Sequence, residues 1–392
     1  MIMSDSDSPL PDPTSAVSTA FHHLCGRPPA GVWSAPGRVN IIGEHTDYND
    51  GYVLPFALPQ RVTLAAAGRG DDRWTVHSLT TGESSEFTAD DLHPGMSGWQ
   101  TYLAGVVWAL REAGYRAGGA DLVLTSDVPI GAGLSSSAAL ECATLTALAD
   151  LYGLTIAGLD RAKLARRAEN EFVGAPTGLM DQAASTLCTR GNALFFDCRT
   201  YAAEQVPFDL NGVGLELLVL DTKTKHTHVD SEYATRRRSC DEAARMLGVQ
   251  ALRDVATQDL QDALTRLGDD EMRRRVSHVV TEDQRVLDAV AVLRKGRLRD
   301  LGPLLDASHA SMRDNFEITV PTVDLAVRTA KSAGALGARM TGGGFGGCII
   351  ALTERGQGTQ TAAAVETAFG AAGFDPPTHF LAEPSPGAGR LA

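Results

Sequence analysis

Residues 127–153 read DVPIGAGLSSSAALECATLTALADLYG, and this stretch decides the fold. An apolar strand ends at Pro129, a short loop with two glycines follows, and three serines open a helix. We expect this helix to bury one apolar stripe, made of Leu140, Ala143, Ala147, Leu148 and Leu151. A strand that leads through a glycine loop into a buried helix indicates a fold that mixes helices with sheets.

The glycine–serine loop has the properties of a phosphate site. Glycines let backbone N–H groups approach a ligand closely, and a helix N-terminus offers unpaired donors at its positive end. A capping box needs Glu or Gln three residues after the cap, but Ala138, Ala139 and Leu140 stand there, so the donors stay free. The alternative is an ordinary strand–turn–helix joint with serine caps. No Gly-Lys dipeptide occurs in the chain, which excludes a Walker loop.

The elements around this stretch predict an α+β fold with two domains. Strands are expected at 61–68, 120–129, 214–222 and 348–353, and helices at 101–114, 231–248 and over most of 250–335. Ser231 is the expected N-cap of the second helix and Gly248 its end. A chain of 392 residues suits two packed domains, divided near 205–215. The predicted division is a disordered leader at 1–25, an N-terminal domain at 26–210 and a C-terminal domain at 211–392.

Composition excludes several classes of protein. The net charge of −13 argues against a general nucleic-acid binder, which must neutralise phosphates. No apolar run is long enough to span a membrane, and the polar, acidic N-terminus lacks the features of a signal peptide. The six cysteines form no CxxC pair, which indicates buried thiols in a reducing compartment and no zinc site. These features predict a cytoplasmic protein.

A second stretch, GRVNIIGEHTDYNDG at 37–51, crowds five ionisable side chains into one segment. Glu44, His45 and Asp47 are compatible with a metal site. Their position beside Arg38 and Asn40 fits a polyhydroxyl ligand better, since sugar hydroxyls both donate and accept hydrogen bonds.

Two further carboxylates are candidates for chemistry. Asp181 follows a turn that contains Gly174, Pro176 and Gly178, a rigid position suited to a catalytic base, and the plain alternative is a helix N-cap. Glu169 lies beside the apolar face of a helix and is within reach of a divalent cation, although such a glutamate is more often solvated or ion-paired.

The glycine run MTGGGFGGCII at 340–350 satisfies G-x-G-x-x-G. It leads into a strand instead of a helix, so it is not a dinucleotide fingerprint, and an oxidoreductase is excluded on this context. We interpret it as backbone that passes close to a ligand or to another loop.

Taken together, these segments resemble the galactokinase branch of the GHMP small-molecule kinase superfamily. The resemblance runs from about Gly31 to the C-terminus. Its motifs are PGRVNIIGEHTDYNDGYVLPFAL, PIGAGLSSSAALE, GLMDQ, SEYATRRRSC, SMRDNFEITVP and MTGGGFGGC, in the family's order and spacing. The implied fold has an N-terminal domain like ribosomal protein S5 domain 2 and a ferredoxin-like C-terminal domain, with the active site between them.

The resemblance also implies roles for individual residues. Arg38 corresponds to the arginine that stabilises the transferring group, and Asp181 to the base or electrostatic partner of the sugar's C1 hydroxyl. The implied sugar-binding residues are Glu44, His45, Thr46, Asp47, Gly178 and Tyr233. The implied ATP-binding residues are Ser78, Trp99, Gly131, Ala132, Gly133, Leu134, Ser135, Ser136 and Ser137. Ser137 and Glu169 correspond to the magnesium ligands.

The implied activity is ATP-dependent phosphorylation of α-D-galactose at its C1 hydroxyl, the first committed step of galactose catabolism in the Leloir pathway. The alternatives are a 1-kinase for N-acetylgalactosamine or arabinose, and a sensor that binds sugar and ATP without turnover. Such sensors shorten the serine–alanine loop, which is intact here at 135–139. The expected partners are small molecules, with no nucleic acid and no membrane, and the expected state is a monomer. The sequence leaves open whether Asp181 abstracts the proton or only orients the hydroxyl.

Overall fold

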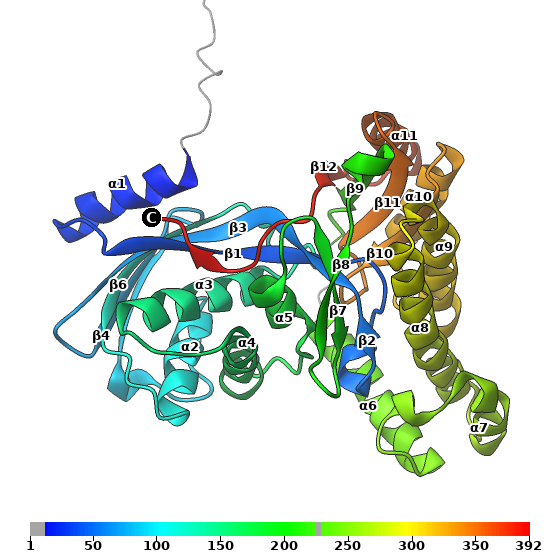
Figure 1. Ribbon diagram of the computed structural model, residues 1–392, viewed down its shortest axis with the longest axis horizontal. Helices are drawn as coiled ribbons and strands as arrows, with labels where there is room; N and C mark the ends of the chain where they lie inside the picture. Colours follow the sequence, from blue (N-terminus) through cyan, green and yellow to red (C-terminus); the bar gives the residue numbers. More distant parts are fainter. Residues whose placement is uncertain (1–11, 225–228) are drawn as a thin grey trace, which may run out of the picture.

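The computed structural model describes residues 12–224 and 229–392 and contains three sheets (Figure 1). The largest sheet has six strands, and only its β4–β6 pair is parallel. In spatial order its strands are β13 (Gly389–Arg390), β1 (Gly31–Asn40), β3 (Pro55–Gly68), β6 (Ala120–Ser126), β4 (Arg73–Ser78) and β5 (Ser84–Thr88).

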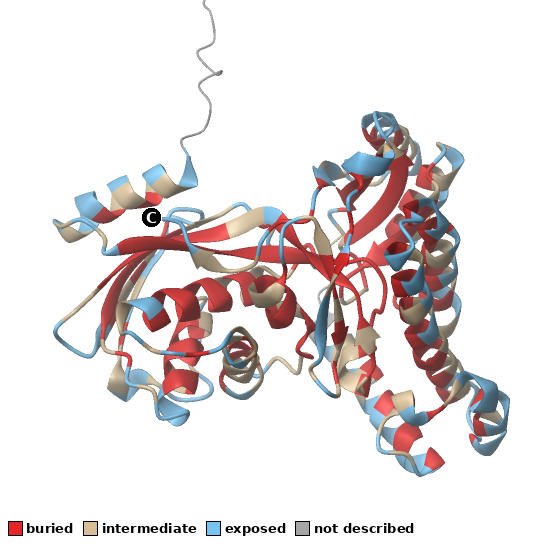
Figure 2. Ribbon diagram, in the orientation of Figure 1, coloured by how far each residue is buried: buried red, intermediate tan, exposed pale blue. Residues whose placement is uncertain are grey.

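Helices cover both faces of this sheet. Helix α1 (Pro13–Cys25) lies on one face, and four helices and a π-helical segment lie on the other. Those on the second side are α2 (Thr101–Glu112), α3 (Ser136–Leu151), α4 (Gly158–Arg167), η3 (Ala168–Val173) and α5 (Met180–Leu187). Strand β1 is therefore buried along its whole length (Figure 2).

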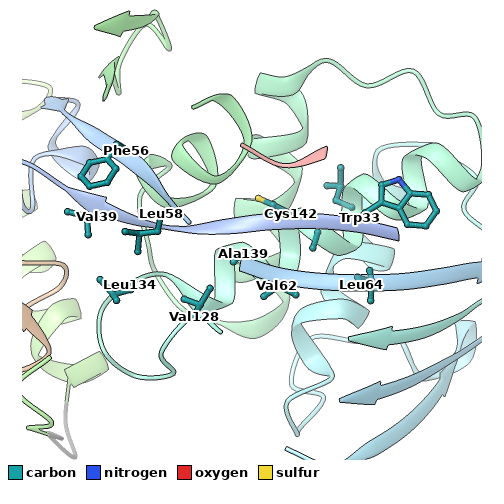
Figure 3. Close-up of a cluster of buried hydrophobic side chains, with 14 of the residues drawn as sticks. Trp33, Val39, Phe56, Leu58, Val62, Leu64, Val128, Leu134, Ala139 and Cys142 are labelled. Atoms are coloured by element: carbon teal, nitrogen blue, oxygen red, sulfur yellow. The ribbon is translucent and has the colours of Figure 1, made fainter. Parts of the chain in front are cut away.

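The core between β1, β3 and α3 contains Trp33, Val39, Phe56, Leu64 and Cys142 (Figure 3). Burial of each large apolar side chain contributes about 1.5–3 kcal/mol to stability. The same cluster continues into β9 and α8, so one apolar core joins the two halves of the chain.

The C-terminal half is built on an antiparallel sheet with the order β10-β11-β9-β12. These strands are β10 (Gly337–Thr341), β11 (Cys348–Glu354), β9 (Leu215–Asp221) and β12 (Thr378–Ala382). The helices are α6 (Val229–Leu247), α7 (Leu260–Arg266), α8 (Asp270–Arg294), α9 (Leu301–Ser311), α10 (Pro321–Ser332) and α11 (Gly358–Ala372).

A small sheet of β2 (Tyr52–Val53), β7 (Asn192–Asp197) and β8 (Ala203–Pro207) lies between the two halves. Short helical turns connect the larger elements. They are η1 (Asp47–Asn49), η2 (Ala89–Asp91), η4 (Asn211–Val213), η5 (Leu252–Asp254), η6 (Thr257–Asp259), η7 (Leu298–Asp300) and the π-helical η8 (Met312–Phe316).

The predicted α+β class is confirmed, and so are the strands and helices expected around the motifs. Gly248, at φ +72°, ends α6 as predicted. The prediction for Ser231 was wrong, because α6 begins at Val229 and Ser231 lies inside its first turn. Among the described helices, none combines the length and apolarity that a bilayer crossing requires.

The structure differs from the predicted domain division at two places, one near each end of the described residues. The expected leader at 1–25 contains α1, because Asp12 caps the helix at Ser15 N and Val17 and Phe21 are buried against the sheet. The last strand, β13, pairs with β1, so the chain end belongs to the N-terminal sheet and not to the predicted domain 211–392. A two-residue strand carries too little periodicity to be recognised in a sequence.

Candidate active site

A cleft of about 720 Å³ lies where the two halves meet. Its lining brings together four segments that are far apart in the sequence: the 38–47 region, the glycine–serine loop, residues 169–181 and the glycine run 342–347. Tyr233 of α6 completes it.

Arg38 and Asp181 form an ion pair at the centre of this cleft. The guanidinium Nε of Arg38 donates to Asp181 Oδ1 over 2.8 Å, and its second terminal nitrogen lies 2.7 Å from the same oxygen. The remaining terminal nitrogen donates to Gly133 O over 2.6 Å. The Ser135 hydroxyl donates to the other Asp181 oxygen. Arg38 is thus held between the glycine–serine loop and the first turn of α5.

The glycine–serine loop leaves the start of α3 uncapped by any side chain. Ser135 precedes the helix in the left-handed conformation, at φ +60°, and its hydroxyl is turned to Asp181. The prediction that the helix does not cap its own amides is confirmed. A helix N-terminus left open at the edge of a cleft is a site for phosphate oxygens.

The glycine run packs against that loop. A Cβ on Gly342 would lie 2.7 Å from Gly133 O, and a Cβ on Gly347 would lie 2.8 Å from Ala132 O, so any side chain there would collide with backbone. The predicted contact with another loop is therefore confirmed. The run also lines the cleft, and its approach to a ligand stays a prediction.

Glu169 and Ser137 lie together beside the loop. Glu169 is 4 % exposed and accepts hydrogen bonds from the side chains of Thr177, Gln182 and Ser137. Burial raises the pKa of Glu169, and the nearby Asp181 charge raises it further. Within residues 12–224 and 229–392 no three His, Cys, Asp or Glu side chains gather as a metal cluster. One carboxylate and one hydroxyl nonetheless fit Mg²⁺, which keeps several waters and takes other ligands from phosphates.

The loop between β1 and β2 carries the predicted sugar ligands. His45 Nε2 lies 3.0 Å from Gly343 O and must donate to it, because a carbonyl only accepts, so Nδ1 accepts from the Tyr48 hydroxyl at 2.7 Å. Burial lowers the pKa of His45 to about 3, which keeps the ring neutral. Asp47 lies beside Gly178, and a Cβ on that glycine would lie only 1.8 Å from Asp47 Oδ2.

Glu44 touches the cleft but is almost fully enclosed, with 1 % exposure. Its carboxylate accepts from Asn40 Nδ2 at 2.8 Å and Gly342 N at 2.9 Å, and it forms an ion pair with Arg339 of β10. Burial raises the pKa of Glu44, whereas Arg339 lowers it. Sequence reasoning missed Arg339, although a single arginine between Ala338 and Met340 in an apolar strand is a signal that a buried partner exists.

The other predicted residues differ in their placement. Thr46 is fully buried, and its hydroxyl donates to Gly43 O and Tyr52 O, so it holds the loop and does not face the cleft. Ser78, Trp99 and Ala132 are not among the described residues that line the cleft. Cleft-lining residues that the sequence did not reveal include Tyr102, Ile130, Thr224 and Phe345.

Three family models match the chain. They are described as the galactokinase galactose-binding signature, at residues 19–68, the GHMP kinases N terminal domain, at 101–189, and the GHMP kinases C terminal, at 289–372. Each falls on one of the segments that form the cleft or its support.

Individual relatives agree with these matches. The chain is 53 % identical to a galactokinase of Streptomyces coelicolor, over 96 % of this chain and 98 % of the relative. It is 45 % identical to a galactokinase of Mycobacterium tuberculosis, over 91 % and 98 %. The crystal structure of Lactococcus lactis galactokinase complexed with galactose superposes with a TM-score of 0.91 at 32 % identity, covering 96 % of this chain and 99 % of that one. On this sequence and structural evidence, the chain belongs to the galactokinase family of the GHMP kinases.

Proposed function

We propose that this chain transfers the γ-phosphate of ATP to the C1 hydroxyl of galactose, giving galactose 1-phosphate and ADP. The observation that carries the proposal is the Arg38–Asp181 pair, which joins the glycine–serine loop to the pocket beside Asp47. Phosphoryl transfer depends mainly on positioning and on charge stabilisation, and one arginine between an anion site and a sugar pocket serves both.

Each residue then has a defined task. The amides at the start of α3 receive phosphate oxygens, and Arg38 faces the charge that develops during transfer. Asp181 accepts a hydrogen bond from the C1 hydroxyl, either to take its proton or to orient its oxygen. Ser137 and Glu169 would hold Mg²⁺, which supplies charge neutralisation at the β- and γ-phosphates when bound. The cytoplasmic location and the monomeric state stay predictions.

The test is an ADP-release assay with ATP and Mg²⁺ on galactose, N-acetylgalactosamine, arabinose, glucose and mevalonate. Turnover with galactose well above the other substrates supports the proposal. Faster turnover with N-acetylgalactosamine or arabinose contradicts the assigned substrate. Absence of turnover combined with galactose-dependent thermal stabilisation indicates the sensor alternative.

We expect kcat/KM for galactose to fall at low pH because the Asp47 carboxylate becomes protonated. Burial, and then the Asp181 charge, raise the pKa of Asp47 to about 6. Above this pH the carboxylate is ionised and accepts from sugar hydroxyls, and below it the protonated form loses that capacity. The value of kcat/KM for galactose, measured from pH 5 to 8 at saturating ATP, is expected to drop below about pH 6. In Asp47→Asn this drop at low pH should disappear. The same drop in both proteins would refute the assignment of the pH dependence to Asp47.

Gly178→Ala is expected to weaken galactose binding. The added Cβ would lie 1.8 Å from Asp47 Oδ2 and 2.3 Å from its Cγ, so the carboxylate must move. Misplacing a binding group by about 1 Å costs roughly 100-fold, and we expect a KM for galactose raised by about that factor with KM for ATP unchanged. Gly370→Ala is the matched control, since a Cβ there meets no atom within 4 Å. An unchanged KM for galactose in Gly178→Ala would show that Asp47 does not bind the sugar.

A further inference from the structure

The sugar loop, residues 43–52, is held by the side chains of a helix from the other half of the chain. Three backbone groups of this loop bond to α8: Gly43 N–H donates to Glu282 Oε1 at 3.0 Å, Tyr52 N–H donates to Asp283 Oδ1 at 2.8 Å, and Glu44 O lies 3.1 Å from His278 Nε2. The three α8 residues are 0 %, 8 % and 0 % exposed for Glu282, Asp283 and His278, respectively.

The loop needs external support because of its backbone conformation. Gly43, His45 and Asp50 all have positive φ, at 105°, 62° and 58°. A non-glycine residue in this region costs on the order of 1–3 kcal/mol and persists only where its surroundings enforce it. Two glycines of the loop allow α8 to pack closely against it. A Cβ on Gly43 would lie 2.8 Å from Val286 Cγ2, and a Cβ on Gly51 would lie 2.3 Å from Asp283 Oδ1.

Two of the three supporting side chains, Glu282 and His278, are themselves fixed by further hydrogen bonds. Glu282 also accepts from Ser308 Oγ at 2.6 Å and from Arg285 Nε at 2.7 Å. His278 Nε2 must donate to the Glu44 carbonyl, so Nδ1 accepts from Ser311 Oγ at 3.0 Å. Burial opposes ionisation of Glu282, but Arg285 and Arg339 outweigh it and lower the pKa of Glu282 to about 2, so Gly43 N–H donates to a charged acceptor.

We propose that His278, Glu282 and Asp283 are positioning residues for the sugar substrate. They hold the backbone between Gly43 and Tyr52 in its binding conformation, although the cleft lining does not include them. The proposal rests on the proposed function, because it concerns the galactose side of the same site. It assigns to α8 a task that acts on the sugar and leaves the ATP side unaffected.

The decisive variant is Asp283→Ala, which removes the side-chain acceptor of the Tyr52 N–H. We expect KM for galactose to rise by about tenfold or more, with KM for ATP within about twofold. Asp283→Asn keeps an oxygen at the Oδ1 position and should restore most of the galactose affinity. Gln284→Ala is the matched control, because this neighbouring side chain is exposed and bonds to Asp288 on the same helix.

The second readout is ligand binding, measured as the rise in Tm that each ligand produces on its own. The rise in Tm produced by galactose should shrink in Asp283→Ala, and the rise produced by ATP should stay. Equal losses for both ligands, or unchanged values for both, would overturn the positioning role and leave α8 a purely structural support. If Asp283→Ala does not fold, Gly51→Ala presses on the same carboxylate from the loop side and is held to the same criterion.

These readouts separate the two proposals. A wild-type protein that shows a galactose-dependent Tm rise but no turnover refutes the proposed function, while Asp283→Ala still tests the positioning role. A wild-type protein with neither turnover nor any Tm response to galactose overturns both.

Discussion

Replacing Asp181 with alanine is expected to lower kcat by about 10³-fold or more and to change ATP affinity by less than about threefold. Asp181 fixes two nitrogens of Arg38 and the hydroxyl of Ser135 at the junction of the two substrate sites. Its loss removes the partner of the C1 hydroxyl and frees Arg38 to turn away. The backbone of the glycine–serine loop does not depend on Asp181, so nucleotide binding should be retained. Steady-state kinetics and calorimetric titration with ATP measure the two quantities.

Asp181→Asn separates the two possible tasks of this carboxylate. An asparagine retains the acceptor for Arg38 and loses the basicity, so a loss as large as that of the alanine variant indicates proton abstraction, and a much smaller loss indicates orientation. Asp160→Ala is the matched control, since Asp160 is an exposed aspartate in the first turn of neighbouring α4. Near-normal turnover in Asp181→Ala would refute the catalytic assignment.

The sequence allowed prediction of those site features that local chemistry encodes. The open start of α3 follows from the absence of Glu or Gln at 138–140, and the structure shows no side-chain cap there. The family resemblance placed Arg38 and Asp181 in one active site, and the structure shows that the two side chains form an ion pair. The open helix start depends on a few neighbouring residues, so its signal survives in the linear chain, whereas Arg38 and Asp181 lie 143 positions apart and are connected only through the family motifs.

Features that depend on long-range packing were not predictable. The expected single apolar stripe of α3 is an example: the helix is buried on almost every side, and Glu141 within it is fully enclosed. Enclosure comes from the sheet and from the helices around α3, which local periodicity does not report. The contacts of α8 with the sugar loop join residues more than 230 positions apart, and no spacing rule connects them.

The Glu44–Arg339 pair combines both situations, because its acidic member lies in a recognised motif and its basic member does not. Arg339 is fully buried and also donates to Ile41 O at 2.8 Å, so it ties β10 to the segment just before the sugar loop as well as to Glu44 within it. Glu44 in turn accepts a hydrogen bond from Gly342 N, and Gly342 packs against the glycine–serine loop. One buried ion pair therefore links the sugar loop, the glycine run and the glycine–serine loop.

We expect Arg339→Ala to lower the free energy of unfolding by about 3–5 kcal/mol, because it leaves the Glu44 carboxylate buried without its counter-charge. Urea unfolding followed by tryptophan fluorescence measures the loss. The control is Arg328→Ala, an exposed arginine on α10, for which a change within about 0.5 kcal/mol is expected.

The double variant Glu44→Gln with Arg339→Met tests the cause. If the destabilisation comes from an unpaired buried charge, removal of both charges should recover a large part of the lost stability, since a buried ion pair replaced by neutral groups of similar size is often nearly neutral. The double variant should also lose galactose affinity, because the loop would no longer be tied to β10. A loss below about 1 kcal/mol in Arg339→Ala, or a double variant less stable than the single one, would show that Glu44 is stabilised by its other donors and that the ion pair does not hold the two halves together.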